Sequence, residues 1–221
     1  MKKQFLLLSL AAFSAAAFAQ TSPSFGIKAG ISNSGLRGDA VKSLQGIIGN
    51  TNGLLTASNR TGFFGGGYAT IPVAGNFSIE PGLYYSQKGY GLQGSFAMKG
   101  AEFLSANAKA QLNTSYLDVP VLAKVNVSGL QLFAGPQVSY LASAKLHTTA
   151  GALGFNIVNS EMDAKSQFNQ WDVALTGGVG YQFTNGFNVS ASYDYGLSKV
   201  DKGQNLNAYN RAVKVGFGFR F

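Results

Sequence analysis

The chain has 221 residues, of which 46% are hydrophobic and only 12% are charged, with 29 glycines and no cysteine. This composition excludes a disulfide framework and a lipid-anchored cysteine. Low charge combined with abundant glycine is unusual for a domain bathed in water on all sides, so we expect something other than water to cover much of the surface.

The first 19 residues have the anatomy of a secretory signal peptide. Lys2 and Lys3 precede an apolar run that ends at Phe18, and Ala17 and Ala19 frame a small-residue cleavage site. A membrane anchor is the alternative, but the run is short for a spanning helix. We therefore expect residues 20–221 to form an exported domain whose formal charge falls from +8 to +6. In an exported chain this charge favours lipid phosphates or acidic glycans over nucleic acid.

Apolar and polar residues alternate along most of the remaining chain. This period of two is typical of β-strands, because successive side chains point to opposite faces. The pattern predicts about eight strands, at 25–33, 61–73, 77–89, 115–127, 130–143, 170–183, 187–198 and 212–221. The second strand is ambiguous, since Phe63 and Phe64 are adjacent and a slip of one residue would invert its faces.

Short and long connections alternate between these strands. The short ones are 74–76, 128–129 and 184–186, and the long ones are 36–59, 91–111, 144–167 and 199–208. Barrels of the outer membrane have short periplasmic turns and long external loops. The order predicts a closed antiparallel up-and-down transmembrane β-barrel of about eight strands with both ends in the periplasm.

The polar face carries charges at mid-strand positions, among glycine and serine. A soluble sandwich would also alternate, but its polar face would be denser in charge, and a lipocalin-type barrel would need an apolar interior. We expect these charges to pair inside the barrel as a structural network in preference to lining a conducting path. They are Lys28, Glu80, Asp118, Lys124, Asp172, Asp194, Lys214 and Arg220.

Aromatic residues gather near the predicted strand ends, which is typical of membrane–water boundaries. The predicted girdles consist of Tyr116, Trp171, Tyr195 and Tyr209 towards the outside, and Phe183 and Phe187 towards the periplasm. Two segments of the long loops, 41–48 and 96–112, space their apolar residues as a helix does, and we expect them to cap the barrel.

The segments "EPGLYYSQKG" (80–89) and "YLDVPVLAKV" (116–125) resemble strand signatures of the small outer-membrane β-barrel family common in Bacteroidetes, often called PorT-like. A final strand that carries Phe219 and Phe221 is similar to the signal read by the barrel-assembly machinery of Gram-negative bacteria. The resemblance implies an integral outer-membrane protein in contact with lipopolysaccharide. One named member of that family serves protein secretion.

The residues do not favour an enzyme, and no cofactor or metal site is expected. His147 is the only histidine, and Ser139 or Ser143 could be imagined as its nucleophile, but no third group is fixed beside them. The leading hypothesis is a monomeric barrel with a structural or surface-interaction role through its external loops, whose ligand the residues do not identify. A narrow small-solute channel and a secretion-accessory barrel are alternatives, and a lipid-modifying enzyme is the weakest.

Overall fold

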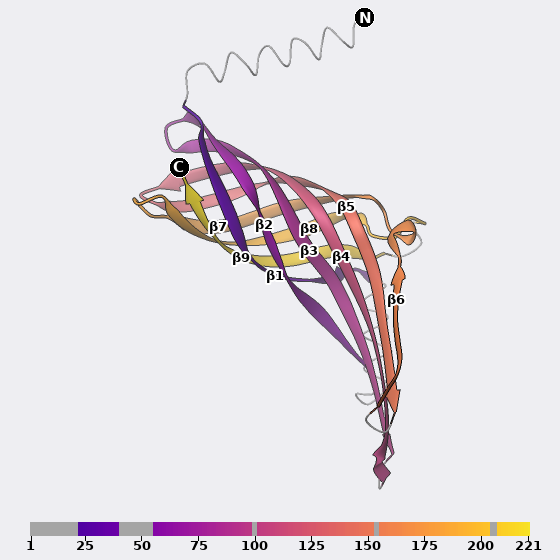
Figure 1. Cartoon of the computed structure of the whole chain (residues 1–221). Helices are drawn as coiled ribbons and strands as arrows, with labels where there is room; N and C mark the ends of the chain where they lie inside the picture. Colours follow the sequence, from indigo (N-terminus) through magenta and orange to yellow (C-terminus); the bar gives the residue numbers. More distant parts are fainter. Residues whose placement is uncertain (1–21, 40–54, 99–100, 153–154, 204–206) are drawn as a thin grey trace, which may run out of the picture.

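The computed structural model describes residues 22–39, 55–98, 101–152, 155–203 and 207–221 (Figure 1). The expected leader, 1–19, and the helix-like segment 41–48 lie outside these ranges. Within them the backbone is almost entirely β-strand, with one 3-10 turn, η1 (Lys165–Gln167). None of the described helical segments is long and apolar enough to cross a membrane.

In the described ranges, nine antiparallel strands are present. They are β1 (Ser24–Arg37), β2 (Leu55–Ala74), β3 (Phe77–Met98), β4 (Ala101–Val127), β5 (Leu130–Ala152), β6 (Phe155–Asp163), β7 (Trp171–Gln182), β8 (Phe187–Lys199) and β9 (Tyr209–Arg220). Eight of these nine close a ring in the order β1-β2-β3-β4-β5-β7-β8-β9, because β4 pairs with β5 and β9 pairs with β1. β6 lies outside the ring and pairs with the outer part of β5. The predicted up-and-down barrel is confirmed.

The ring is closed by the first and last strands. Their register runs from Gly26 opposite Arg220 to Arg37 opposite Tyr209. The pairing continues to the end of the chain, where the Phe221 N–H donates to the carbonyl of Phe25 at 2.9 Å. Closure leaves no open backbone edge in the wall, which hydrocarbon would not tolerate.

The two faces of the wall are inverted relative to a water-soluble barrel. On β9, Phe217 faces outward and is 67% exposed, whereas Lys214 faces inward and is 7% exposed. The same division holds on β4, where the outward Val121 is exposed and the inward Lys124 is buried. An apolar exterior around a polar interior is the arrangement of a barrel whose solvent is lipid.

Three tight turns join strands at one end of the barrel. They follow β2, β4 and β7, at the positions that the glycines and asparagines predict. Gly129 and Gly186 adopt φ of 91° and 92°, a left-handed conformation that glycine enters without a Cβ penalty. The start of β1 and the end of β9 lie at this same end of the barrel, and we assign this end to the periplasm.

At the end opposite the tight turns, the barrel wall extends much further on one side than on the other. β2 to β5 have 20 to 27 residues, against 12 to 14 for β1, β7, β8 and β9. With β6 they continue past the ring as a tapering sheet, seen at the lower right of Figure 1. We call this part, residues 55–59, 90–98, 101–113, 145–152 and 155–163, the sheet extension.

The sheet extension corrects one expectation. Residues 96–112 were expected to form a capping helix, but their described part belongs to β3 and β4. Ser95 pairs with Asn107 and Gly91 with Gln111, so the hairpin continues the ladder of the barrel wall. Each additional pair satisfies backbone groups along an existing ladder, which outweighs the weak helical spacing of a few apolar residues.

Candidate functional site

The interior of the barrel contains a first ion cluster near its periplasmic half, centred on Glu80 of β3. The Glu80 carboxylate accepts a hydrogen bond from Lys124 of β4 and pairs with Lys28 of β1 at 3.7 Å. Thr70 of β2 donates a further hydrogen bond at 3.1 Å. Four neighbouring strands therefore converge on one buried carboxylate.

A second ion cluster lies towards the external half, around Asp118 of β4. Its carboxylate pairs with Lys88 of β3 at 3.2 Å and with Lys214 of β9 at 3.1 Å, and it accepts a 2.6 Å hydrogen bond from Ser86. Lys214 also pairs with Asp194 of β8 at 2.6 Å. Because both clusters are buried, removing one partner would leave an uncompensated charge.

Asp172 of β7 completes the polar interior near the external rim. It accepts hydrogen bonds from Ser198 at 2.5 Å and from Asn210 at 2.8 Å. Together with the two clusters, the described interior holds four carboxylates and four lysines. These formal charges cancel, so the lumen presents no net charge to a passing ion.

Aromatic rings fill the space between the two clusters. Phe64, Tyr68 and Tyr84 pack together, and Phe133 approaches from the opposite wall. The rings fit because glycines face them: a Cβ on Gly216 would lie 2.7 Å from the Phe64 ring. Between rings and ions, the described residues line an interior cavity of about 40 Å³. That volume holds a few water molecules.

The structure places the eight residues of the predicted network as follows. Lys28, Glu80, Asp118, Lys124, Asp172, Asp194 and Lys214 lie in the interior, whereas Arg220 lies partly exposed at the periplasmic rim. The prediction missed Lys88, which pairs with Asp118 although it is only 2% exposed. Lys88 has the same strand parity as Glu80, and that parity was the signal that could have found it.

The aromatic residues divide in a way that corrects one prediction. Trp171, Phe183, Phe187 and Tyr195 face outward, and Tyr209 is partly exposed. Arg37 stacks on Tyr195 and Tyr209, with its guanidinium carbon 3.6 Å and 4.7 Å from the two ring centroids. Tyr116 does not belong to a girdle.

Tyr116 is 3% exposed and lies inside the barrel. It shares its parity with Asp118, so the alternation that directs Asp118 inward directs the tyrosine inward too. Its ring lies 4.7 Å from the Lys88 ammonium, and its hydroxyl accepts a 3.4 Å hydrogen bond from Asn210. The tyrosine therefore packs against the ionic interior.

His147 lies on the sheet extension, opposite Gln111 of β4 and Glu161 of β6. Ser143 and Ser139 are four and eight residues away on the same strand, roughly 13 Å and 26 Å along it. Ser139 is buried in the lumen, where its hydroxyl accepts a 3.2 Å hydrogen bond from Gln137. The structure thus keeps the imagined nucleophiles away from the histidine, and no metal-binding group of three acidic or histidine residues occurs in the described ranges.

An exposed ion pair lies on the sheet extension. Lys145 of β5 donates to the Glu161 carboxylate of β6 at 2.7 Å. This hydrogen bond lowers the pKa of Glu161 and raises the pKa of Lys145. The pair ties the outermost strand to the rest of the sheet.

A closed barrel with a lipid-compatible exterior and a paired ionic interior defines an integral outer-membrane β-barrel. The family model of the outer membrane protein beta-barrel domain matches residues 18–202, most of the chain. The protein therefore belongs to the outer membrane protein beta-barrel domain family and resides in the outer membrane.

Comparison with other proteins adds similarities of fold. No curated protein gives a significant match. Among solved structures, Neisserial surface protein A is 13% identical over 90% of this chain and 99% of that chain, with a TM-score of 0.47. Ail of Yersinia pestis, in complex with the heparin analogue sucrose octasulfate, is 13% identical over 90% and 99%, with a TM-score of 0.46. The N-terminal barrel of Pseudomonas aeruginosa OprF is 17% identical over 91% and 100%, with a TM-score of 0.37.

Proposed function

We propose that this outer-membrane barrel is non-conducting and acts through its external surface, chiefly through the sheet extension. The observation that carries the proposal is the contrast between a filled lumen and a wall that continues past the rim on one side (Figure 1). A pore needs a continuous path, whereas a surface protein needs a rigid platform that projects from the membrane. The geometry supports the role of a surface protein over that of a pore.

The filled lumen argues against the small-solute channel. Asp118 and Lys214 meet across it, and the Phe64 and Tyr84 rings occupy the layer below them. Purified protein in a planar bilayer should therefore give no conductance steps above those of the empty bilayer. Reproducible steps that change in Lys124→Gln or Asp118→Asn would overturn the proposal and favour a channel.

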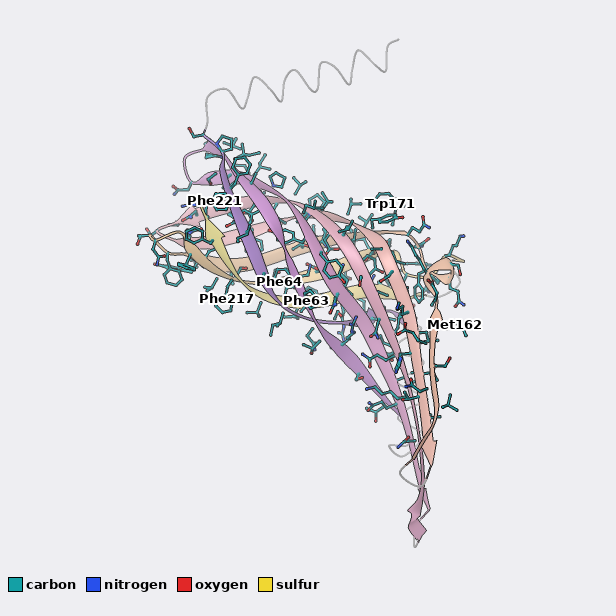
Figure 2. The ribbon with its side chains drawn as sticks, in the orientation of Figure 1. Phe63, Phe64, Met162, Trp171, Phe217 and Phe221 are labelled. Carbon is teal, nitrogen blue, oxygen red and sulfur yellow. The ribbon has the colours of Figure 1, made fainter. Side chains whose placement is uncertain are left out.

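The sheet extension supplies the external surface. Its outermost strand, β6, pairs with β5 alone among the described residues. Val158 on this strand is exposed, and so is Met162, which is labelled in Figure 2. An unpaired strand edge is a common docking element for an extended segment of a partner. Because the ring itself has no open edge, we propose that the barrel is a monomer in the membrane.

Labelling of single cysteines in intact cells tests the orientation, since the chain has no native cysteine. An impermeant maleimide should label cysteines at Ser58 and Ser160, on the external side, and spare cysteines at Ser128 and Asn185, in the periplasmic turns. After the outer membrane is permeabilised, all four should react. The reverse pattern in intact cells would contradict the proposed surface role.

We further propose that the chain is PorT-like within its family. Its support is the pair of segments 80–89 and 116–125, which contribute Glu80, Lys88, Asp118 and Lys124 to the lumen. The secretion-accessory role follows from that resemblance. Deletion of the protein should then leave secreted cargo inside the cell, measured by proteomics of the medium, and normal export would exclude this role.

A further inference from the structure

A hollow of about 300 Å³ with both polar and apolar walls opens at the external rim of the barrel, beside η1 and the first residues of β7. Two lysines line it, Lys165 from η1 and Lys202 from the segment after β8. Ser166, Phe168, Asn169, Gln170 and Trp171 complete the lining. None of these residues contributes to the lumen clusters.

Backbone hydrogen bonds hold the hollow in shape. The Lys202 N–H donates to the carbonyl of Gln167 at 3.0 Å, which ties the two lysine-bearing segments together. The Asn169 side chain donates to the carbonyls of Lys199 and Asp201 at 2.9 Å and 3.2 Å. The lysines therefore project from a fixed frame, which lowers the entropic cost of binding an anion.

The floor of the hollow is aromatic and faces lipid. Trp171 is 62% exposed and lies on the outer surface of the wall (Figure 2). It packs edge-on against Tyr140, with ring centroids 5.2 Å apart, and the Lys165 ammonium lies 5.5 Å from the Tyr140 ring. Below Trp171 the outward residues of β7 are Val173 and Leu175, so cationic and apolar surfaces meet at one place.

The charge around the hollow favours an anion. Asp163 does not line the hollow. Its carboxylate accepts a hydrogen bond from the backbone N–H of Lys165 at 2.8 Å. Over the external side of the described ranges, eight basic residues outnumber five acidic ones. The basic residues are Arg37, Arg60, Lys109, Lys145, Lys165, Lys199, Lys202 and Arg211, and the acidic ones are Asp39, Glu102, Glu161, Asp163 and Asp201.

We propose that this hollow binds a phosphorylated glycolipid of the outer leaflet, with a phosphate between Lys165 and Lys202 and an acyl chain along Trp171 and Val173. Ser166 and Gln170 offer polar groups to the sugar. An amphiphile with an anionic sugar headgroup matches both surfaces, whereas a free phosphate would leave the aromatic floor unused. The inference rests on the proposed orientation, which places this rim in the outer leaflet.

The fluorescence of Trp171, the only tryptophan, reports binding directly. Lipid A with both phosphates, titrated into the purified barrel in neutral detergent micelles, should produce a saturable shift in emission. Lys165→Gln combined with Lys202→Gln should weaken apparent affinity at least about tenfold, because two charge-assisted contacts are lost. Lys109→Gln, which removes a lysine of the sheet extension, should leave affinity unchanged.

Two further titrations decide the source of the anion. Dephosphorylated lipid A should bind at least about tenfold more weakly, and inorganic phosphate at millimolar concentration should neither shift the emission nor compete. The proposed site would be wrong if dephosphorylated lipid A bound as tightly as the phosphorylated form. It would also be wrong if Lys109→Gln weakened binding as much as Lys165→Gln combined with Lys202→Gln. The titration uses purified protein, so its failure would leave the conductance and labelling tests of the proposed function intact.

Discussion

Asp118 of β4 and Lys214 of β9 form a 3.1 Å ion pair between strands that lie four steps apart in the eight-membered ring. The pair therefore joins opposite walls. Asn188 of β8 and Tyr68 of β2, three steps apart, are joined by a 3.0 Å hydrogen bond in the same way. Such cross-lumen contacts brace the barrel from within.

Asp118→Asn should destabilise the barrel by about 3–5 kcal/mol, because Lys88 is left buried without a carboxylate. Unfolding by urea in lipid vesicles measures the loss. The double variant Asp118→Asn with Lys88→Met should recover part of it, since Lys214 keeps Asp194 as a partner. A single variant as stable as the wild type would show that the ion cluster does not brace the wall.

Phe63 and Phe64 form a matched pair of adjacent residues with opposite orientations (Figure 2). Phe64 is 6% exposed inside the barrel, and Phe63 is 53% exposed on the lipid face. Phe64→Ala should cost about 3–5 kcal/mol, as in other buried phenylalanine truncations, and Phe63→Ala clearly less. The same urea titration compares the two, and equal losses would contradict the assigned faces of β2.

The depth of Trp171 can be measured with brominated lipids, which quench tryptophan on contact. Bromine near the headgroup should quench Trp171 more strongly than bromine near the chain end, because the residue lies at the external rim. As a control, Trp171→Phe with Tyr116→Trp moves the fluorophore into the lumen. Bromine at any depth should then quench the fluorescence of this tryptophan only weakly. Strong quenching would show that residue 116 faces lipid, as the predicted girdle required.

Phe221 is a candidate for the assembly signal, since it is 70% exposed at the end of the closing strand. Phe221→Ala should lower the amount of barrel inserted in cells, measured in outer-membrane fractions, while folding of purified protein into vesicles changes little. Phe217→Ala removes a similar outward ring from the same strand and should insert normally. Equal insertion defects in both variants would point to lost lipid contact instead of a lost signal.

The Lys145–Glu161 pair should make the β5–β6 hairpin sensitive to pH. Because the pKa of Glu161 is lowered in the folded chain, its contribution exists above the ordinary carboxyl pKa and is lost as pH falls through the lowered value. Hydrogen exchange of β6 amides, corrected for the intrinsic rate, should accelerate below about pH 4. In Lys145→Gln this acid-dependent step should disappear, and an unchanged step would assign it to another group.

The alternation of residues predicted the faces of β3, β4, β8 and β9 because parity is a local property of a strand. It did not predict which inward residues meet, because that depends on the register around the whole ring, as the Asp118–Lys214 pair shows. The error at Tyr116 arose from weighing its position near a strand end over its parity. Neither Phe63 nor Phe64 could be oriented locally, and inward glycines such as Gly216 resolve the choice by making room for Phe64.

The sheet extension was hidden for a different reason. Residues 91–111 and 144–167 are polar on both faces in many places, so no buried side fixes a period of two. Their strands form because the barrel wall offers a ladder to continue, which is a property of the folded neighbour. The lysines of the rim hollow were likewise separate in sequence. The Lys202–Gln167 hydrogen bond, together with those of Asn169 to residues 199–201, joins the two segments that carry them.

Pairing between β1 and β9 also sets the timing of assembly. The strand made first, 24–37, finds its second neighbour only when residues 209–220 have been synthesised and translocated. Contacts of such long sequence separation are slow to form, so we expect ring closure to be a late step of folding, before which the free edges of β1 and β9 have no partner strand. The wall therefore cannot close before residues 209–220 have been made and have reached β1.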